Sequence, residues 1–260
     1  MSHQVRNEEF TRQAPTSAIL ILVVALLLGA TSASAQSLNH FQCYEVSNTT
    51  FALRPGVALV DRLGPLTVGV YGPHTLCAPS DKNGEDPTAP LDPDHLLAYR
   101  LRRTERFEKV FAQRVTNQFG TLSVDLVKPA RLMVPTATSL TGPAIPIAPA
   151  IDHFTCYKVR KTAGTSRFAR VSNVTIETSL ETLTFDVRKP RRLCLPTDKN
   201  GETPGAENHP EHLMCYRIRV SKPVTRIRGT QVIVNNQFGQ ESYRLSGSRR
   251  EFCVPSLIVP

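Results

Sequence analysis

The amino-acid sequence predicts an all-β protein with two small, disulfide-bonded, sandwich-like or barrel-like domains, each made of two quasi-repeats of about 45 residues. Three observations support this prediction. One sequence plan occurs four times, the cysteines recur at fixed places within that plan, and apolar residues alternate with polar ones as they do along a strand. These features concern architecture, and they leave the ligand of the protein open.

Each copy opens on a histidine and closes on a short segment that contains a proline. The opening pattern is H-F-Q-C-Y-E-V in the first copy and H-F-T-C-Y-K-V in the third, and the closing pattern of the third is K-P-R-R-L-C-L-P. The copies span residues 39–80, 94–138, 151–197 and 211–256.

Every copy has the pattern of short strands. In the fourth, Met214, Tyr216 and Ile218 alternate with other residues at a period of two. A β-branched run then leads into a turn such as N-Q-F-G at Asn117, whose polar first residue and final glycine suit a hairpin. A third strand follows, and a proline such as Pro129 precedes the short closing strand. We therefore expect four short strands per copy and little helix, with segment 100–114 as the most helix-like part.

The repeats also predict how the cysteines pair. Three copies have one cysteine in the opening strand and one before the closing proline, whereas the second copy has Ala98 and Met133 at these places. Loss of both residues together is expected of a bonded pair. Among the 15 connectivities open to six cysteines, this selects Cys43–Cys77, Cys156–Cys194 and Cys215–Cys253. Each bond closes a loop of about 35 to 39 residues, which stabilises the fold by up to about 4 kcal/mol. The alternative, a zinc site, is disfavoured because no C-x-x-C occurs.

The first 35 residues have the pattern of a secretory signal. Arg6 and Arg12 lie in a polar leader, an apolar segment runs from Ile19 to Leu28, and A-S-A ends at Ala35. The apolar segment is short for a membrane span, which needs about 20 residues, although an uncleaved anchor is an alternative. We expect no transmembrane span after cleavage and a secreted, periplasmic or cell-surface protein, which suits paired cysteines.

The remaining chain of about 225 residues is predicted to divide in two. A Pro/Ala-rich linker at residues 139–150 separates repeat pair one (36–138) from repeat pair two (151–260). Within each pair, a connector that begins D-K-N-G-E joins the two copies, at Asp81 and at Asp198.

The motifs H-F-x-C-Y-x-V, K-P-x-R-L-C-x-P and D-K-N-G-E together resemble an uncharacterised family of secreted bacterial repeat proteins, known as a domain of unknown function. The resemblance covers nearly all of the chain after the signal. It implies export and a repeated disulfide-bonded module, and it implies no activity and no catalytic residues. The second copy departs from the pattern because it lacks the cysteine pair.

The chain is basic, with a formal net charge of +9 at pH 7. Basic residues recur at alternate positions of the opening strands and beside the closing proline, where they could form a stripe that attracts a polyanion such as an acidic polysaccharide. A solvated basic face is the alternative. The candidate polyanion-binding residues are Arg100, Arg102, Lys158, Arg160, Arg217, Arg219, Arg191 and Arg192.

The acidic connectors are weaker candidates for calcium, since Asp81, Asn83, Asp198 and Asn200 offer oxygen ligands without the EF-hand spacing. The four repeated histidines suit a structural hydrogen bond better than catalysis. No dinucleotide, phosphate-loop, zinc-peptidase, hydrolase or specific nucleic-acid motif occurs. We therefore expect neither a cofactor nor a firm metal site.

These observations favour a secreted, non-enzymatic β-repeat module that binds a ligand, or serves a structural role, at the cell surface or in the extracellular matrix. Two alternatives stay open: an extracellular hydrolase with its site between paired repeats, and a purely structural component of the envelope.

Overall fold

The computed structural model describes Met1 and residues 38–47, 50–221 and 227–260. The predicted signal segment, residues 1–35, lies outside the described part apart from Met1, so its cleavage stays a prediction. Residues 36–260 belong to one compact unit.

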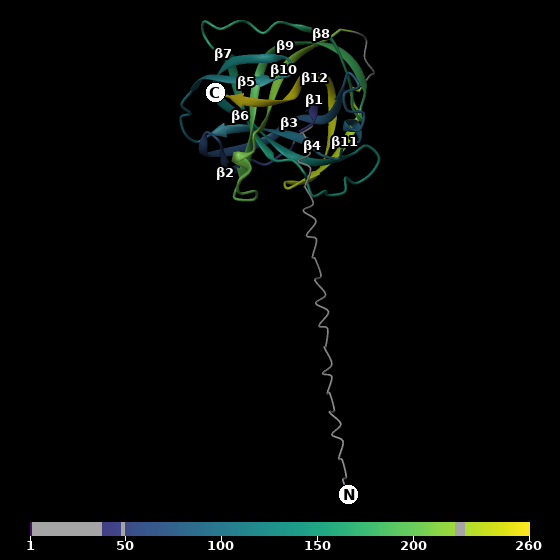
Figure 1. The fold of residues 1–260 in the computed structure, drawn as a ribbon. Helices are drawn as coiled ribbons and strands as arrows, with labels where there is room; N and C mark the ends of the chain where they lie inside the picture. The colour runs from purple at the N-terminus through teal and green to yellow at the C-terminus, as the bar shows by residue number, and fades with distance from the viewer. Residues whose placement is uncertain (2–37, 48–49, 222–226) are drawn as a thin grey trace. The chain divides into compact units, whose positions relative to one another are not determined.

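The described residues confirm the all-β prediction (Figure 1). Two single turns of 3-10 helix, η1 (Ala89–Leu91) and η2 (Ala206–Asn208), lie in the connectors. The strands are β1 (His40–Ser47), β2 (Arg54–Asp61), β3 (Gly64–Lys82), β4 (His95–Arg103), β5 (Val110–Asn117), β6 (Gly120–Ser139), β7 (His153–Lys161), β8 (Val171–Glu177), β9 (Thr182–Lys199), β10 (Glu211–Val220), β11 (Gln231–Asn236) and β12 (Gly239–Val259).

Among the described residues each copy therefore contains three strands: an opening strand, a middle strand and a long strand. The expected third and closing strands form a single long strand, such as β6. The proline between them interrupts the register without ending the strand, because pairing resumes on both sides of Pro73 and Pro129. A proline lacks the N–H that a ladder needs, and a local bulge accommodates that loss. The helix-like segment 100–114 contains the end of β4 and the start of β5, with no helix.

Opening and long strands alternate around a closed ring. Each long strand pairs with the opening strand of its own copy and with that of the next copy, and every pairing is antiparallel. β12 returns to β1 and closes the ring between the last copy and the first. Closure leaves no unpaired edge among these strands.

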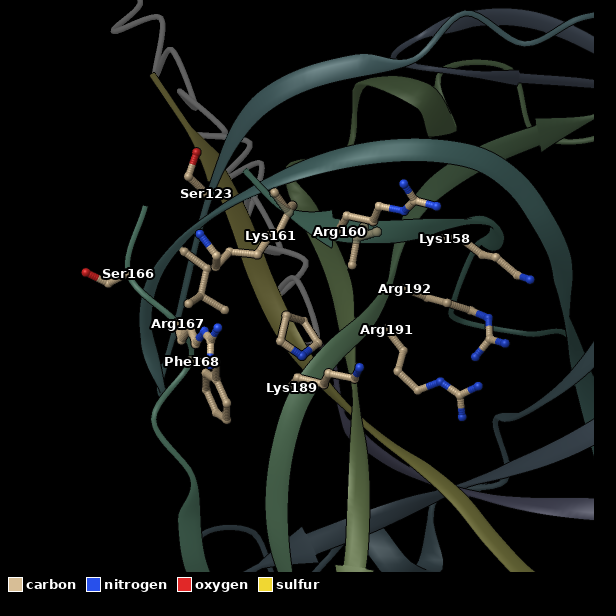
Figure 2. Close-up of a pocket in the computed structure, with 14 residues that line it drawn as sticks. Ser123, Lys158, Arg160, Lys161, Ser166, Arg167, Phe168, Lys189, Arg191 and Arg192 are labelled. Atoms are coloured by element: carbon tan, nitrogen blue, oxygen red, sulfur yellow. The ribbon is translucent and has the colours of Figure 1, made fainter. Parts of the chain in front are cut away.

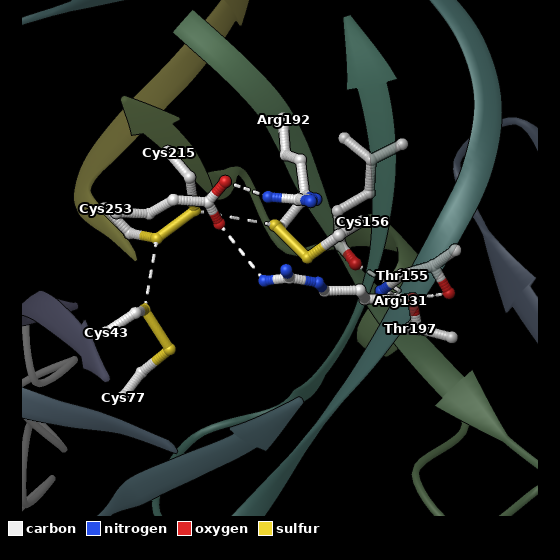
Figure 3. The surroundings of a disulfide bond; sticks show 12 residues. Cys43, Cys77, Arg131, Thr155, Cys156, Arg192, Thr197, Cys215 and Cys253 are labelled. Carbon is white, nitrogen blue, oxygen red and sulfur yellow. Dashed lines mark hydrogen bonds and ion pairs between the residues drawn. A yellow bond between two sulfur atoms is a disulfide. The ribbon is translucent and has the colours of Figure 1, made fainter. Parts of the chain in front are cut away.

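Alternate side chains of the ring point inward and form a core that contains all three disulfides. The bonds join the expected partners, Cys43–Cys77, Cys156–Cys194 and Cys215–Cys253. In each bond the two cysteines are directly opposite each other in the strand pair. Figure 3 shows neighbouring bonds in contact: sulfur atoms lie 3.8 Å apart between Cys43 and Cys253, and 3.9 Å apart between Cys194 and Cys215.

The second copy fills the corresponding place with a non-covalent pair. Ala98 and Met133 are opposite each other in register, and both side chains belong to the same inner core. The inner core is thus continuous around the ring even where the cross-link is missing.

The middle strands lie outside the ring and join copies that are not consecutive in sequence. Each forms a hairpin with its own long strand and also pairs with the far end of another: β2 with β9, β8 with β3, β5 with β12 and β11 with β6. Copies one and three are linked in this way, as are copies two and four. Two outer hydrophobic clusters fill the space beneath these hairpins.

The structure differs from the expected division into two domains, 36–138 and 151–260. Strand pairs cross that boundary repeatedly, and segment 139–150, although mostly exposed, is attached to the rest of the chain at Ala144 and Ala150. Asn235 Nδ2 donates to the Ala144 carbonyl oxygen at 3.0 Å, and Ala144 is buried. The physical reason is that one repeat pair supplies only half of the ring and would leave open strand edges on both sides.

Candidate anion-binding cleft

A cleft of about 660 Å³ lies where the second and third copies meet, between strands β6, β7 and β9 and the segment around Phe168 (Figure 2). This volume is in the range of sites that hold small molecules. Its lining residues are Leu122, Ser123, Val124, Lys158, Val159, Arg160, Lys161, Ser166, Arg167, Phe168, Lys189, Pro190, Arg191 and Arg192.

The lining is strongly basic. Half of its residues carry a positive charge, and none of the described lining residues is acidic. Figure 2 shows two groups of side chains: Lys158, Arg191 and Arg192 on one side, called here the inner end, and Lys161, Arg167 and Phe168 on the other, the outer end. A cleft lined by charges of one sign concentrates ions of the opposite sign.

The bend of β9 explains why two consecutive arginines reach the same cleft. Opposite β10, Pro190 pairs with Tyr216 and Arg192 with Cys215, so Arg191 is the extra residue of a bulge. A bulge redirects side chains that would otherwise alternate between the two faces of a strand. On the other side of β9, Lys158 of β7 lies opposite Arg192.

At its inner end the cleft is lined by Arg192, whose side chain is buried. Arg131 and Arg192 come two residues before Met133 and Cys194, and both are buried with exposed fractions of 6% and 5%. Both bind the carboxylate of Glu251, which is fully buried. Arg131 Nη1 lies 3.2 Å from Glu251 Oε2, and Arg192 Nη1 bonds Glu251 Oε1; Figure 3 labels both arginines and marks these contacts with dashed lines.

Positive charge exceeds negative charge at this point. Arg191 Nε also lies 3.3 Å from Glu251 Oε1, so three guanidinium groups share one carboxylate. Burial, and then repulsion from Arg131 and Arg191, lowers the pKa of Arg192. Burial and neighbouring cations, with Lys128 first among them, likewise lower the pKa of Lys158. An anion bound here would relieve this repulsion.

Four of the eight predicted polyanion-binding residues line the cleft: Lys158, Arg160, Arg191 and Arg192. Arg100, Arg102, Arg217 and Arg219 occupy equivalent places on β4 and β10 and do not line it. The expected single stripe is divided because the ring directs the opening strands of successive copies toward different sides.

The sequence reasoning missed three residues of the site, Lys161, Arg167 and Glu251, whereas Lys189 was among the basic residues beside the closing proline. Lys161 and Arg167 each lie close to another basic residue, a pattern that could have drawn attention to them. The signal for Glu251 was an acid at the place where the second and third copies have Arg131 and Arg192.

The D-K-N-G-E connectors form turns that attach one copy to another. Asp81 Oδ1 accepts the N–H of Asp86 at 3.0 Å, and Lys82 pairs with Glu85. Asn83 has a left-handed backbone with φ of 56° and exchanges two hydrogen bonds of 2.9 Å with Thr175 of the third copy.

The second connector repeats this geometry. Asp198 Oδ1 accepts the N–H of Thr203, and Asn200 exchanges two hydrogen bonds with Ala58 of the first copy. These contacts give the four calcium candidates a structural role. Among the described residues, no three His, Cys, Asp or Glu side chains are grouped closely enough to hold a metal ion.

The repeated tyrosines and histidines contact residues in the hairpin turns of other copies. The first residue of each turn bonds the tyrosine of the non-consecutive copy, at heavy-atom distances of 2.6 to 3.1 Å. These pairs are Asp61–Tyr157, Asn117–Tyr216, Thr178–Tyr44 and Asn236–Tyr99. The second turn residue contacts a histidine in three cases: Gln118 with His40, Gln237 with His153 and Arg62 with His212.

Burial, the largest cause, lowers the pKa of these three histidines to about 4. They are therefore neutral at pH 7 and serve as contacts for the turns. Within the described ranges, the chain has no helix of the length and apolarity that crossing a bilayer requires.

Comparison with known proteins identifies one family. No curated protein and no solved structure shows significant similarity to the chain. A family model described as a repeat of unknown function, DUF7450, matches residues 95–255, which cover most of the second, third and fourth copies. The match takes in more than half of the chain, all three strands of the cleft and both of its ends. The chain therefore belongs to the DUF7450 repeat family.

Proposed function

We propose that the protein is a secreted, non-enzymatic module that binds an anionic polysaccharide or another polyanion through the basic cleft. The observation that carries this proposal is the convergence of seven cationic side chains on one cleft whose described lining includes no carboxylate. A merely solvated face would spread such charges around the molecule, whereas here strands β7 and β9 supply six of them and Arg167, in the segment between β7 and β8, supplies the seventh.

The scaffold beneath the cleft suits binding. Lys158 and Arg160 extend from a ring strand whose inward neighbours include the disulfide Cys156–Cys194. A rigid base reduces the conformational entropy that the protein loses when a bound ligand orders the side chains of the site. The disulfides also suit an oxidising compartment, as export of the chain would require.

The residue types in the lining favour binding over hydrolysis. Its hydroxyl groups are those of Ser123 and Ser166, and the described lining includes no histidine or carboxylate that would activate them. A purely structural role in the envelope would fit the cross-linked ring, but it would give no reason for the gathering of charge.

The experiment is a titration of the full chain with heparin, used as a generic polyanion, followed by isothermal calorimetry at two salt concentrations. We expect the affinity to fall with rising salt, because released counterions contribute to binding. Arg160→Gln tests the cleft, and Arg219→Gln is the matched control, since both arginines are exposed and occupy the same repeat position on β7 and β10.

Loss of one charged contact should weaken binding by about 3- to 10-fold in Arg160→Gln and by less than about 2-fold in Arg219→Gln. Equal effects of the two substitutions would show that binding involves only the overall charge. Absence of heparin binding at low salt would refute the proposal.

A further inference from the structure

The inner end of the cleft contains a buried donor that no other described group satisfies. Arg192 bonds Glu251 through Nη1, while its Nε is buried and has no hydrogen-bond partner among the described residues. A buried N–H without an acceptor is costly, and such groups call for an explanation. Because Arg192 lines the cleft, an acceptor could come from a bound ligand.

Glu251 does not accept a hydrogen bond from Arg192 Nε. Its Oε1 is engaged by Arg191 and Arg192, and its Oε2 by Arg131. The carboxylate thus holds the three arginines in place, and Lys158 lies opposite Arg192 on the neighbouring strand. These four cationic groups exceed the one carboxylate by three charges, which is more than one carboxylate from a ligand would neutralise.

We propose that the inner end of the cleft is a site for one phosphate or sulfate group, bound by Arg192, Arg191 and Lys158. This inference rests on the proposed function and adds a ligand class to it: a phosphorylated or sulfated molecule, in contrast to a polymer of carboxylates. A tetrahedral oxyanion suits donors that come from two strands, because its oxygens point in several directions, whereas those of a carboxylate lie in one plane.

The outer end has different chemistry and is suited to the remainder of the ligand. Phe168 is half-buried and packs against Tyr216, with ring centroids 4.9 Å apart. Arg167 and Lys161 lie beside it with exposed side chains. This end offers apolar surface and spread charge, without a buried and unpartnered donor such as Arg192 Nε.

The test measures the binding of small anions to the full chain at constant ionic strength, with the disulfides intact. The probes are inorganic phosphate, inorganic sulfate, glucose 6-phosphate and glucose 6-sulfate, with glucuronate as the carboxylate control. We expect saturable binding of the phosphate and sulfate probes, detected by calorimetry and by a rise in melting temperature, and at least 10-fold weaker binding of glucuronate. Comparison of the phosphate and sulfate arms shows which group the site prefers.

Lys158→Gln should weaken the preferred probe by at least 5-fold, since it removes an exposed charge opposite Arg192. Arg217→Gln is the control: it is the same strand position in the fourth copy, where the opposite residue is Glu251, and it should change affinity by less than 2-fold. Arg192→Lys keeps the charge but removes Nε, and should also weaken binding if the variant folds.

The proposed phosphate or sulfate site would be refuted if glucuronate bound as tightly as the phosphate and sulfate probes. It would also be refuted if Lys158→Gln and Arg217→Gln changed the affinity equally. If heparin binds but none of the small phosphate or sulfate probes does, the inner site is wrong while the proposed function stands. If neither heparin nor any small probe binds, both proposals fail.

Discussion

Neutralising Glu251 should destabilise the protein severely. The side chain is fully buried, and Glu251→Gln would leave Arg131 and Arg192, with exposed fractions of 6% and 5%, without their countercharge. Breaking a buried ion pair from one side costs about 3–5 kcal/mol, because the remaining charge stays buried and uncompensated. For a chain of this size that corresponds to a fall in melting temperature of about 6–20 °C.

Urea unfolding under non-reducing conditions measures this effect. The chain has no tryptophan, so far-UV circular dichroism is the suitable signal. Glu241→Gln, an exposed glutamate on the same strand β12, is the control and should change the free energy of unfolding by less than about 0.5 kcal/mol. Sulfate in the solvent should recover part of the loss in Glu251→Gln, because it supplies a countercharge. If Glu251→Gln were as stable as Glu241→Gln, the assignment of Glu251 as the centre of a buried charge cluster would be refuted.

Two further predictions concern the turns and the missing cross-link. Burial raises the pKa of Asp61 to about 6 from 3.8, so the folded state binds a proton more tightly than the unfolded state, and stability should decline as pH rises from about 4 to about 6. Asp61→Asn, the residue that Asn117 and Asn236 provide in other copies, should remove that decline and raise the free energy of unfolding at pH 7 by about 1–3 kcal/mol; unfolding curves at pH 4.5 and pH 7 check it, and an unchanged pH dependence would contradict it. The double substitution Ala98→Cys and Met133→Cys should form a fourth bond, since these residues are opposite each other in register; intact mass under non-reducing conditions would show the loss of two hydrogens, and free thiols in the folded protein would speak against the repeat alignment.

The candidate site was partly predictable from the sequence. Lys158 and Arg160 could be found because strand periodicity puts alternate residues on one face. Arg191 and Arg192 could be found as a basic pair beside a proline, but the bulge that directs both toward the cleft depends on the partner strand. Equivalent residues such as Arg100 and Arg217 look the same in the sequence, and only their positions around the ring exclude them from the lining.

The cysteine pairing was accessible from the sequence because it is local to each copy. Within a copy the opening strand and the closing half of the long strand lie side by side, so a comparison of copies is enough to match Cys156 with Cys194. Strand content and hairpin turns were accessible for the same reason, because both depend on residues close together in the chain.

The number of domains and the location of the cleft were decided by the tertiary structure. A Pro/Ala-rich segment looks like a linker by composition, yet the buried Ala144 within residues 139–150 is bonded by Asn235 of the fourth copy once the ring has closed. Closure of the ring depends on the pairing of β1 with β12, and the outer hairpins depend on pairings such as β2 with β9. Both pairings join segments that are distant in the chain, and no local pattern encodes them. The physical reason is that strand edges and hydrophobic faces are nonspecific in isolation, and the assembled ring selects the partners that cover all of them at once.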